Sequence, residues 1–225
     1  MCLMVVHFQP GPEGRTLVVA NRDEWRSRPT APLAVWTDPP MAAGRDLQAG
    51  GTWMGWGQRG IWGGLTNIYG GSPPSQAPSR GGLIPTWIAS GGKLEALPDL
   101  QPYAGVNLLL GDGQHLYYRS NRHPGQVLGE GLYALSNASL DTPWPKLLLA
   151  RQSAELLLQQ PFSPEAWLAW GEQRGPEEGL GSIFVDLPDY GTRSTTVALG
   201  DRHGWQIWER RHDQPAETTY VRYSG

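Results

Sequence analysis

The sequence contains a single cysteine, Cys2, and no apolar run as long as a membrane span. One cysteine excludes an internal disulfide framework and any zinc site built from several cysteines. A membrane-spanning helix needs about 18 or more apolar residues in a row, which this chain lacks. The first residues, MCLMVVHFQPG, have neither a basic region nor a small-residue cleavage site, so no secretory signal is expected. These absences predict a cytoplasmic protein without a membrane span.

The chain also carries little net charge. Lysine and arginine total 18, aspartate and glutamate total 21, and the formal net charge is −3. Such a balance gives no electrostatic footprint for nucleic acid or an anionic membrane, so neither is expected as a partner. Lysine occurs only as Lys93 and Lys146, so arginine supplies nearly all the positive charge. Arginine suits planar, bidentate contacts with anions, although genomic base composition explains the same bias.

The chain nevertheless has the material for a folded core. Hydrophobic residues make up 39% of the 225 residues and include 11 tryptophans, which excludes global disorder. The 30 glycines and 20 prolines stay below the level typical of low-complexity sequence. No repeat or long linker divides the chain, so one domain over residues 1–225 is predicted. The segment Gly70–Gly82 is expected to be a mobile surface loop.

Short apolar runs separated by turn residues predict antiparallel strands. Asp112-Gly113 lies between two such runs, which is a strong hairpin signal, and Gly200-Asp201 repeats the arrangement. In another segment tryptophan and isoleucine alternate with glycine, which favours strands because glycine is costly inside a helix. The segments expected to contain strands are Cys2–Phe8, Thr16–Ala20, Trp53–Gly64, Asn107–Tyr118 and Thr195–Trp208.

Helical patterns are fewer. In Trp144–Gln160 apolar residues recur at i, i+3/i+4 and i+7 spacing, at Leu147, Leu148, Ala150, Ala154, Leu157 and Leu158. Pro145 suits the first turn of this helix, and Pro161 ends it. Leu83–Ser90 and Ser163–Trp170 are expected to be two shorter helices. These patterns predict an α+β fold with much antiparallel sheet.

Cys2 is the first candidate for chemistry. Removal of Met1 would place the thiol on the terminal residue, beside a free α-amine. Such an amine has a reference pKa of about 7.7–8.0, which suits a general base for an N-terminal nucleophile. The alternative is a cysteine that packs as a small hydrophobe, and an attached Met1 blocks the mechanism.

Four polar residues, Asn21-Arg22-Asp23-Glu24, directly follow the second predicted strand. A hairpin would return this end of the strand to Cys2. Asp23 or Arg22 could then orient the amine or hold a substrate carboxylate or carbonyl. A solvated turn is the alternative. Arg26 and Arg28 extend a basic cluster that could meet an acidic ligand or pair with Asp23 and Glu24.

Several blocks of the sequence resemble the NRDE family, of the transport-and-Golgi-organisation type. The more specific blocks are Met1-Cys2, Ala20-Asn21-Arg22-Asp23-Glu24 with Arg28-Pro29-Thr30, and Leu135-Ser136-Asn137 running into residues 140–146. Shorter blocks follow in the family's order: Gly44-Arg45-Asp46, Gly50-Gly51-Thr52-Trp53, Gly63 with Leu65-Thr66-Asn67, and Tyr190-Gly191-Thr192-Arg193-Ser194. The resemblance implies a four-layer αββα sandwich with antiparallel sheets, the fold of N-terminal-nucleophile hydrolases. It implies a distant similarity to their cysteine branch, which contains penicillin V acylases and bile salt hydrolases.

That more distant similarity implies roles for individual residues. Cys2 matches the nucleophile, Asp23 the aspartate beside the terminal amine, and Asn21 the asparagine of the same motif. Asn67 and Asn137 resemble two asparagines that help to form the oxyanion hole, where a side-chain amide donates to the tetrahedral oxyanion. Turn chemistry is the alternative explanation for both asparagines.

Two arginines complete the implied site. Arg193 resembles a late arginine of the substrate pocket. The branch has an arginine where this chain has Ala20, so Arg22 would have to reach the same space from another position. The retained Cys2, Asp23 and Asn137 favour a hydrolase, whereas Ala20 in place of the branch's arginine favours a binding protein.

Two functions therefore remain open. The first is an N-terminal cysteine amidohydrolase that cleaves the C–N bond of a small amide and needs no cofactor or metal. The second is a non-catalytic protein on the same fold that handles haem, acyl-CoA or lipid, as the family resemblance implies. The sequence has no haem attachment motif. His115, His203 and His212 are expected at the surface, and the tryptophans either line a pocket or form the core.

Overall fold

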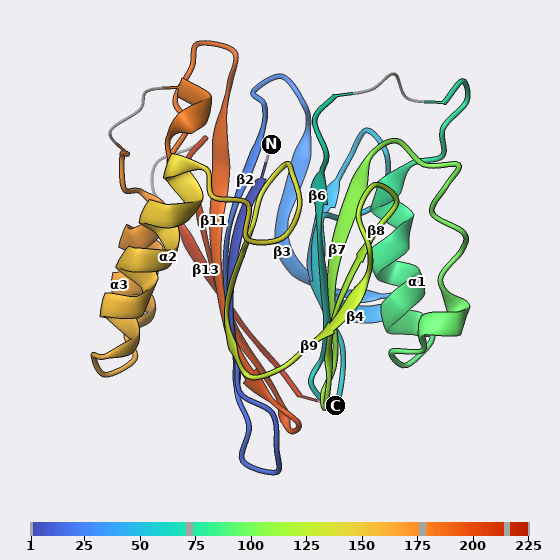
Figure 1. Ribbon diagram of the computed structural model, residues 1–225, viewed down its shortest axis with the longest axis horizontal. Coiled ribbons are helices and arrows are strands. Elements are labelled where there is room, and N and C mark those ends of the chain that lie inside the picture. The colour runs from blue at the N-terminus through green and yellow to red at the C-terminus, as the bar shows by residue number, and fades with distance from the viewer. Residues whose placement is uncertain (1, 71–73, 176–178, 214–216, 225) are drawn as a thin grey trace.

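Two antiparallel β-sheets lie face to face at the centre of the computed structural model, which describes residues 2–70, 74–175, 179–213 and 217–224 (Figure 1). The first sheet has the strand order β10 (Gly131–Leu135), β1 (Cys2–Phe8), β2 (Thr16–Trp25), β11 (Tyr190–Asp201), β12 (Gly204–Arg211) and β13 (Thr218–Tyr223). The second has the order β3 (Thr30–Thr37), β4 (Pro40–Asp46), β5 (Met54–Trp56), β6 (Ile61–Asn67), β7 (Val106–Asp112), β8 (Leu116–Ser120) and β9 (Gln126–Leu128).

Helices cover the outer face of each sheet. Helices α2 (Pro145–Leu158) and α3 (Pro164–Gly171) pack on the first sheet, and α1 (Leu83–Ala89) packs on the second, as Figure 1 shows. Short 3-10 turns occur at Arg80–Gly82, Leu94–Ala96 and Gly179–Gly181. The arrangement confirms the predicted α+β fold and its four αββα layers.

Alternate side chains of the central strands pack into two different hydrophobic cores. Met4 and Val6 of β1 belong to the core between the sheets, whereas Leu3 and Val5 belong to the core under α2 and α3. Successive side chains of a strand point to opposite faces, so a continuous apolar run is what a sheet covered on both sides requires. A third core lies between α1 and the second sheet.

Glycines make room for tryptophans between the sheets. Gly111 pairs with Trp62 across β6 and β7, and a Cβ at Gly111 would come within 2.2 Å of the Trp62 indole nitrogen. Gly200 pairs with Trp205 in the same way, at 2.3 Å from its ring. Trp62 and Trp205 then meet edge to face across the two sheets, with ring centroids 6.4 Å apart. Each of these glycines and the tryptophan opposite it are therefore matched halves of one packing arrangement.

Most predicted elements lie where the sequence placed them, and the caps have the expected form. Ser163 caps α3 by accepting a hydrogen bond from the Ala166 N–H, and the Asp112-Gly113 turn joins β7 to β8. The prediction was wrong for Leu148, which is exposed although its pattern placed it on the buried face of α2. It was also wrong about the second strand, which does not end at Ala20. Pairing with β1 continues β2 to Arg22, and pairing with β11 extends it to Trp25.

The tryptophan packing predicts the cost of filling one glycine site. We expect Gly111→Ala to lower the free energy of unfolding by about 1–3 kcal/mol, because the added methyl forces the Trp62 ring to move. Urea denaturation measures this directly. Gly129→Ala is the control, since a Cβ at this exposed glycine meets nothing within 4 Å. An equal, small effect of both substitutions would contradict the packing argument.

Candidate active site

A pocket of about 680 Å³ lies at the end of the sheets where β1 begins. Antiparallel pairing places Cys2 of β1 opposite Arg22 of β2, and both residues line the pocket. The second sheet contributes Asn67 at the end of β6. The other described lining residues are Asp23, Glu24, Arg28, Asp46, Ala49, Thr52, Trp53, Leu65, Pro74, Gln76, Ala77, Pro78, Ser79, Arg80, Gly81 and Ala104.

Cys2 carries a thiol that its surroundings keep protonated. Burial raises the pKa of the thiol above its ordinary value, and the nearby Asp23 carboxylate acts in the same direction. The Arg22 charge and the backbone N–H of Asp23 oppose this shift without reversing it. A thiol in this state is a poor nucleophile at neutral pH unless a base removes its proton.

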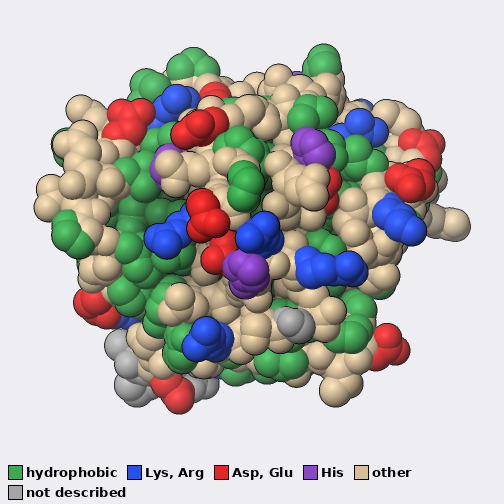
Figure 2. Space-filling model, turned by 90° about the horizontal axis from the view of Figure 1, so that it is seen from below, with side chains coloured by type: hydrophobic (Ala, Val, Ile, Leu, Met, Phe, Trp, Pro, Cys, Tyr) green, Lys and Arg blue, Asp and Glu red, His purple; other side chains and the backbone are tan. Residues whose placement is uncertain are grey.

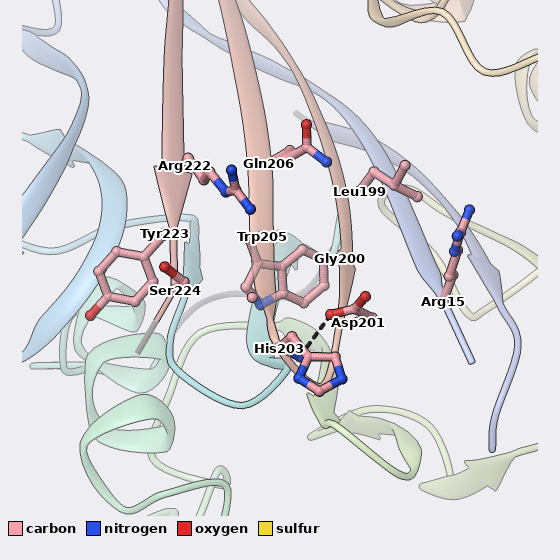
Figure 3. Close-up of a pocket in the computed structure, with 11 residues that line it drawn as sticks. Arg15, Leu199, Gly200, Asp201, His203, Trp205, Gln206, Arg222, Tyr223 and Ser224 are labelled. Atoms are coloured by element: carbon pink, nitrogen blue, oxygen red, sulfur yellow. Dashed lines mark hydrogen bonds between the residues drawn. The ribbon is translucent and has the colours of Figure 1, made fainter. Parts of the chain in front are cut away.

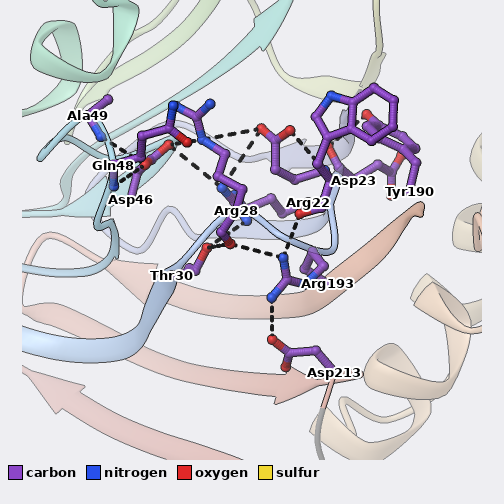
Figure 4. Close-up of polar contacts among 12 residues, drawn as sticks. Arg22, Asp23, Arg28, Thr30, Asp46, Gln48, Ala49, Tyr190, Arg193 and Asp213 are labelled. Carbon is purple, nitrogen blue, oxygen red and sulfur yellow. Dashed lines mark hydrogen bonds and ion pairs between the residues drawn. The ribbon is translucent and has the colours of Figure 1, made fainter.

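Asp23 is buried beside Cys2 and accepts a hydrogen bond at Oδ1 from the Thr192 hydroxyl, at 2.7 Å. Burial raises the pKa of Asp23 to about 6, while the Thr192 hydroxyl and the charges of Lys146 and Arg22 hold it from rising further. The Tyr190 hydroxyl donates to the backbone oxygen of Asp23 at 2.9 Å and helps to fix this part of β2 (Figure 4). The carboxyl group can therefore exchange a proton near neutral pH.

Arg22 reaches into the pocket on the face of β2 that looks toward the second sheet. Its guanidinium lies over the Trp53 ring, 4.3 Å from the centroid, and donates to the Thr30 hydroxyl at 3.0 Å. Glu24 Oε2 and Asp46 Oδ2 lie 3.9 and 3.8 Å from its Nη2. The side chain is buried, so these contacts hold its charge in one place.

Asp46 organises the neighbouring wall of the pocket. Burial alone would raise its pKa, but hydrogen bonds from the backbone N–H groups of Ala49 and Gln48 and from Arg28 hold the pKa below its usual range. The Arg28 Nε lies 2.7 Å from Asp46 Oδ2. Arg28 is thereby paired with Asp46, while Arg26 pairs with Asp186 at 2.8 Å.

The two asparagines predicted for the oxyanion hole meet at the ends of the sheets. Asn137 Nδ2 donates to the backbone oxygen of Asn67 at 2.7 Å, and Asn137 Oδ1 accepts from the Ser136 hydroxyl. The same hydroxyl lies 2.9 Å from the Cys2 backbone oxygen, which ties this segment to β1. Asn67 lines the pocket, whereas Asn137 is buried behind it.

Asn21 and Arg193 lie outside the described lining of the pocket. Asn21 points to the helical layer, where Nδ2 donates to the carbonyl oxygens of Gly171 and Ile183. Arg193 donates to the backbone oxygens of Trp25 and Arg28 and pairs with Asp213 at Oδ2, at the lower end of the network in Figure 4. Both side chains brace β2 from outside the pocket.

His212 was expected at the surface, but the structure places it in a partly buried position. It is partly buried against Phe184, and its Nε2 lies 2.9 Å from Thr195 Oγ1. The Thr195 hydroxyl donates to Asn21 Oδ1, so the imidazole N–H is the donor to Thr195. Burial lowers the pKa of His212, which therefore serves as a neutral hydrogen-bonding residue. His115 and His203 are exposed, as predicted.

Sequence reasoning missed one wall of the pocket. Gly70–Gly82 was expected to be a surface loop only, but Pro74 and the residues from Gln76 to Gly81 line the pocket. Residues 71–73 lie outside the described part of the chain. The one feature of the sequence that pointed to this wall is Arg80, an arginine between a serine and two glycines just before a helix.

The opposite end of the first sheet carries a smaller hollow of about 230 Å³ (Figure 3). Asp201 accepts there from the backbone N–H of His203, an ordinary contact within the turn that joins β11 to β12. A broader hollow of about 1140 Å³ at the same end includes Arg59, Lys93 and Arg202. Figure 2 shows acidic, basic and histidine side chains intermixed on this face. Neither hollow contains the cysteine of the chain, so the Cys2 pocket is the better candidate for chemistry.

The sequence comparisons agree over nearly the whole chain. The family model described as Transport and Golgi organisation 2 matches residues 1–214. The chain belongs to this family. It is 32% identical to the Transport and Golgi organization protein 2 homolog of Bos taurus and 31% identical to that of Homo sapiens. Each alignment covers 94% of this chain and 92% of the relative.

The fold has a solved counterpart. The structure of the Caenorhabditis elegans N-acylethanolamine-hydrolyzing acid amidase ortholog matches with a TM-score of 0.58 and 12% identity. The match covers 87% of this chain and 92% of that chain. At this identity the likeness shows a shared fold, which confirms the N-terminal-nucleophile hydrolase-like architecture of this Transport and Golgi organisation 2 family member.

Two further properties follow from the described residues. Among them, no helix has the length and hydropathy needed to cross a bilayer. The same residues contain no cluster of three or more His, Cys, Asp or Glu side chains arranged to hold a metal ion.

The position of Asp23 predicts a pH dependence of stability. Its folded-state pKa of about 6 lies above the ordinary value of 3.8, so its contribution to stability is fully present below 3.8 and is lost as pH rises through 6. We expect Asp23→Asn to stabilise the protein at pH 8 by up to about 3 kcal/mol, since one pKa unit corresponds to about 1.4 kcal/mol, and to change little at pH 3.5.

Chemical denaturation at the two pH values tests this expectation. Asp99→Asn is the matched control, because Asp99 is an exposed aspartate whose side chain accepts from the Gln101 N–H, as an asparagine would. A stabilisation by Asp23→Asn that is equal at both pH values would show that charge burial is not its cause.

Proposed function

We propose that the protein is an N-terminal cysteine amidohydrolase that cleaves the C–N bond of a small amide. The observation that carries the proposal is the position of Cys2, which lines the pocket beside the buried Asp23 and opposite Arg22. The family assignment and the hydrolase-like fold support it. Met1 lies outside the described residues, so its removal stays a prediction.

The proposed reaction begins with the α-amine of Cys2, which is free once Met1 has been removed. The amine takes the thiol proton, and Sγ attacks the amide carbonyl carbon to form a C–S bond. The protonated amine then gives its proton to the leaving nitrogen as the C–N bond breaks. Water hydrolyses the thioester and releases a carboxylic acid, which restores the thiol. The raised pKa of the thiol makes this internal base necessary.

The remaining residues have supporting roles in this mechanism. Asp23 orients the amine and stabilises its protonated form. Asn67 would donate to the tetrahedral oxyanion, a contribution of about 3–4 kcal/mol for a donor of this kind. Asn137 would hold Asn67 in place through its hydrogen bond to the Asn67 backbone oxygen. Arg22 contacts the substrate in the pocket. Asn21 and Arg193 position β2 through their buried hydrogen bonds.

The first test is the reactivity of the Cys2 thiol. Intact mass of the protein expressed without a tag reports whether Met1 is removed. Alkylation with iodoacetamide from pH 5 to 10 then gives the apparent pKa of the thiol. We expect the processed protein to react with an apparent pKa at least about one unit below that of a matched protein with two extra residues before Cys2, in which the α-amine is displaced.

A panel of acyl aminomethylcoumarin amides extends the test to turnover. Product release by the processed protein that is lost in both Cys2→Ala and the extended protein supports the mechanism. Retained Met1, or equal thiol pKa values in the two proteins, would overturn it.

A non-catalytic role with haem or acyl-CoA is the second candidate. The basic residues Arg22, Arg28 and Arg80 in the pocket favour an anionic ligand. Haem fits less well, because the described lining residues include no histidine, methionine or tyrosine, and Cys2 is the one side chain among them that would hold the iron. Titration with haem and with an acyl-CoA would follow an unreactive thiol.

A further inference from the structure

Arg80 is held rigidly at the edge of the pocket by contacts between backbones. The Thr52 N–H donates to the Gly81 carbonyl at 3.0 Å, and the Ser79 hydroxyl accepts from the Gly81 N–H. A Cβ at Gly51 would lie 2.3 Å from the Gly81 oxygen, so only glycine permits this approach. The 3-10 turn that carries Arg80 is therefore fixed against the loop between β4 and β5.

Arg80 differs from the other arginines of the pocket in its partners. Arg22 and Arg28 lie within 4 Å of Asp46 and Glu24 and form one mutual network. Arg80 Nη1 donates to the backbone oxygen of Gly105 at 2.9 Å. Within the described parts of the chain, no carboxylate lies close enough to Arg80 to form an ion pair.

A partly buried cation without an anionic partner is costly, and the cost falls when an anion binds beside it. Burial lowers the pKa of Arg80, yet an arginine stays charged at neutral pH. The charges of Glu24 and of an ionised Cys2 would oppose this shift, and Arg80 lines the same pocket as Cys2. The remaining N–H donors of Arg80 form a planar fork that matches a carboxylate.

We propose that the pocket takes an amide that also carries a carboxylate, with the carboxylate on Arg80 and the amide carbonyl at Cys2. This inference rests on the proposed hydrolase function and specifies its substrate class. A carboxylate is favoured over a phosphate because one unpaired guanidinium faces a pocket that already contains Asp23, Glu24 and Asp46. A dianion would be repelled by these acids.

Binding to the full-length Cys2→Ala protein tests the inference without turnover. Isothermal titration compares N-hexanoylglycine, the neutral N-hexanoylethanolamine and the phosphate ester of the latter. We expect the glycine conjugate to bind at least about tenfold more tightly than the other two, as a charge-assisted pair with Arg80 requires. Arg80→Gln should remove this preference and Arg80→Lys should keep part of it.

Arg202→Gln is the matched control, since Arg202 is exposed at the other end of the molecule and should leave the preference unchanged. Equal binding of the three compounds, no binding of any, or a preference that survives Arg80→Gln would overturn the inference. Tighter binding of the phosphate ester would overturn the assignment to a carboxylate.

Turnover by the protein with Cys2 intact separates the two proposals. Hydrolysis of N-hexanoylglycine with a KM that rises in Arg80→Gln, is partly restored in Arg80→Lys and is unchanged in Arg202→Gln supports both. Binding without hydrolysis would leave the carboxylate site standing and overturn the hydrolase. Hydrolysis of both amides with equal KM would support the hydrolase and overturn the carboxylate site.

Discussion

The site depends above all on the antiparallel pairing of β2 with β1 and β11. This pairing places Cys2 opposite Arg22 and Thr192 opposite Asp23. Pairing with β11 also supplies the hydrogen bonds that continue the strand beyond Arg22 to Trp25, where the sequence alone suggests a turn. Without β11, the backbone groups of Asp23, Glu24 and Trp25 would have no partner strand and β2 would end earlier.

Desolvation sets the protonation of the groups around Cys2. Burial favours the neutral forms of the thiol, Asp23 and Lys146. The charges of Lys146 and Asp23 favour each other's ionised forms, whereas the Asp23 carboxylate disfavours ionisation of the Cys2 thiol. Lys146 is buried in α2 and donates to the Leu180 carbonyl at 3.2 Å, so it contributes positive charge from the helical layer. Asp23, whose pKa is raised to about 6, can exchange a proton near neutral pH, as the proposed hydrolysis would require.

The sequence predicted the elements that carry strong local signals. The hairpin at Asp112-Gly113 and helix α3 behind Ser163 follow from turn and capping chemistry, and the structure confirms them. The four layers came from the family resemblance, whereas the grouping of Cys2 with Asp23 was expected from the hairpin as well as from the resemblance. The role of Arg80 could not be predicted, because its position depends on the contact between Gly51 and Gly81, which are 30 positions apart and carry no side chain to show a pattern.

The contact between Gly51 and Gly81 also has an evolutionary consequence. Because the contact between Gly51 and Gly81 and the Ser79 hydroxyl hold this turn, the side chain at position 80 adds to the frame only its hydrogen bond to the Gly105 carbonyl. Selection can therefore replace that residue, and with it the ligand preference, in a single step without first compensating for a loss of folding. Relatives that keep the two glycines but differ at this position would be expected to share a backbone and diverge in what they recognise.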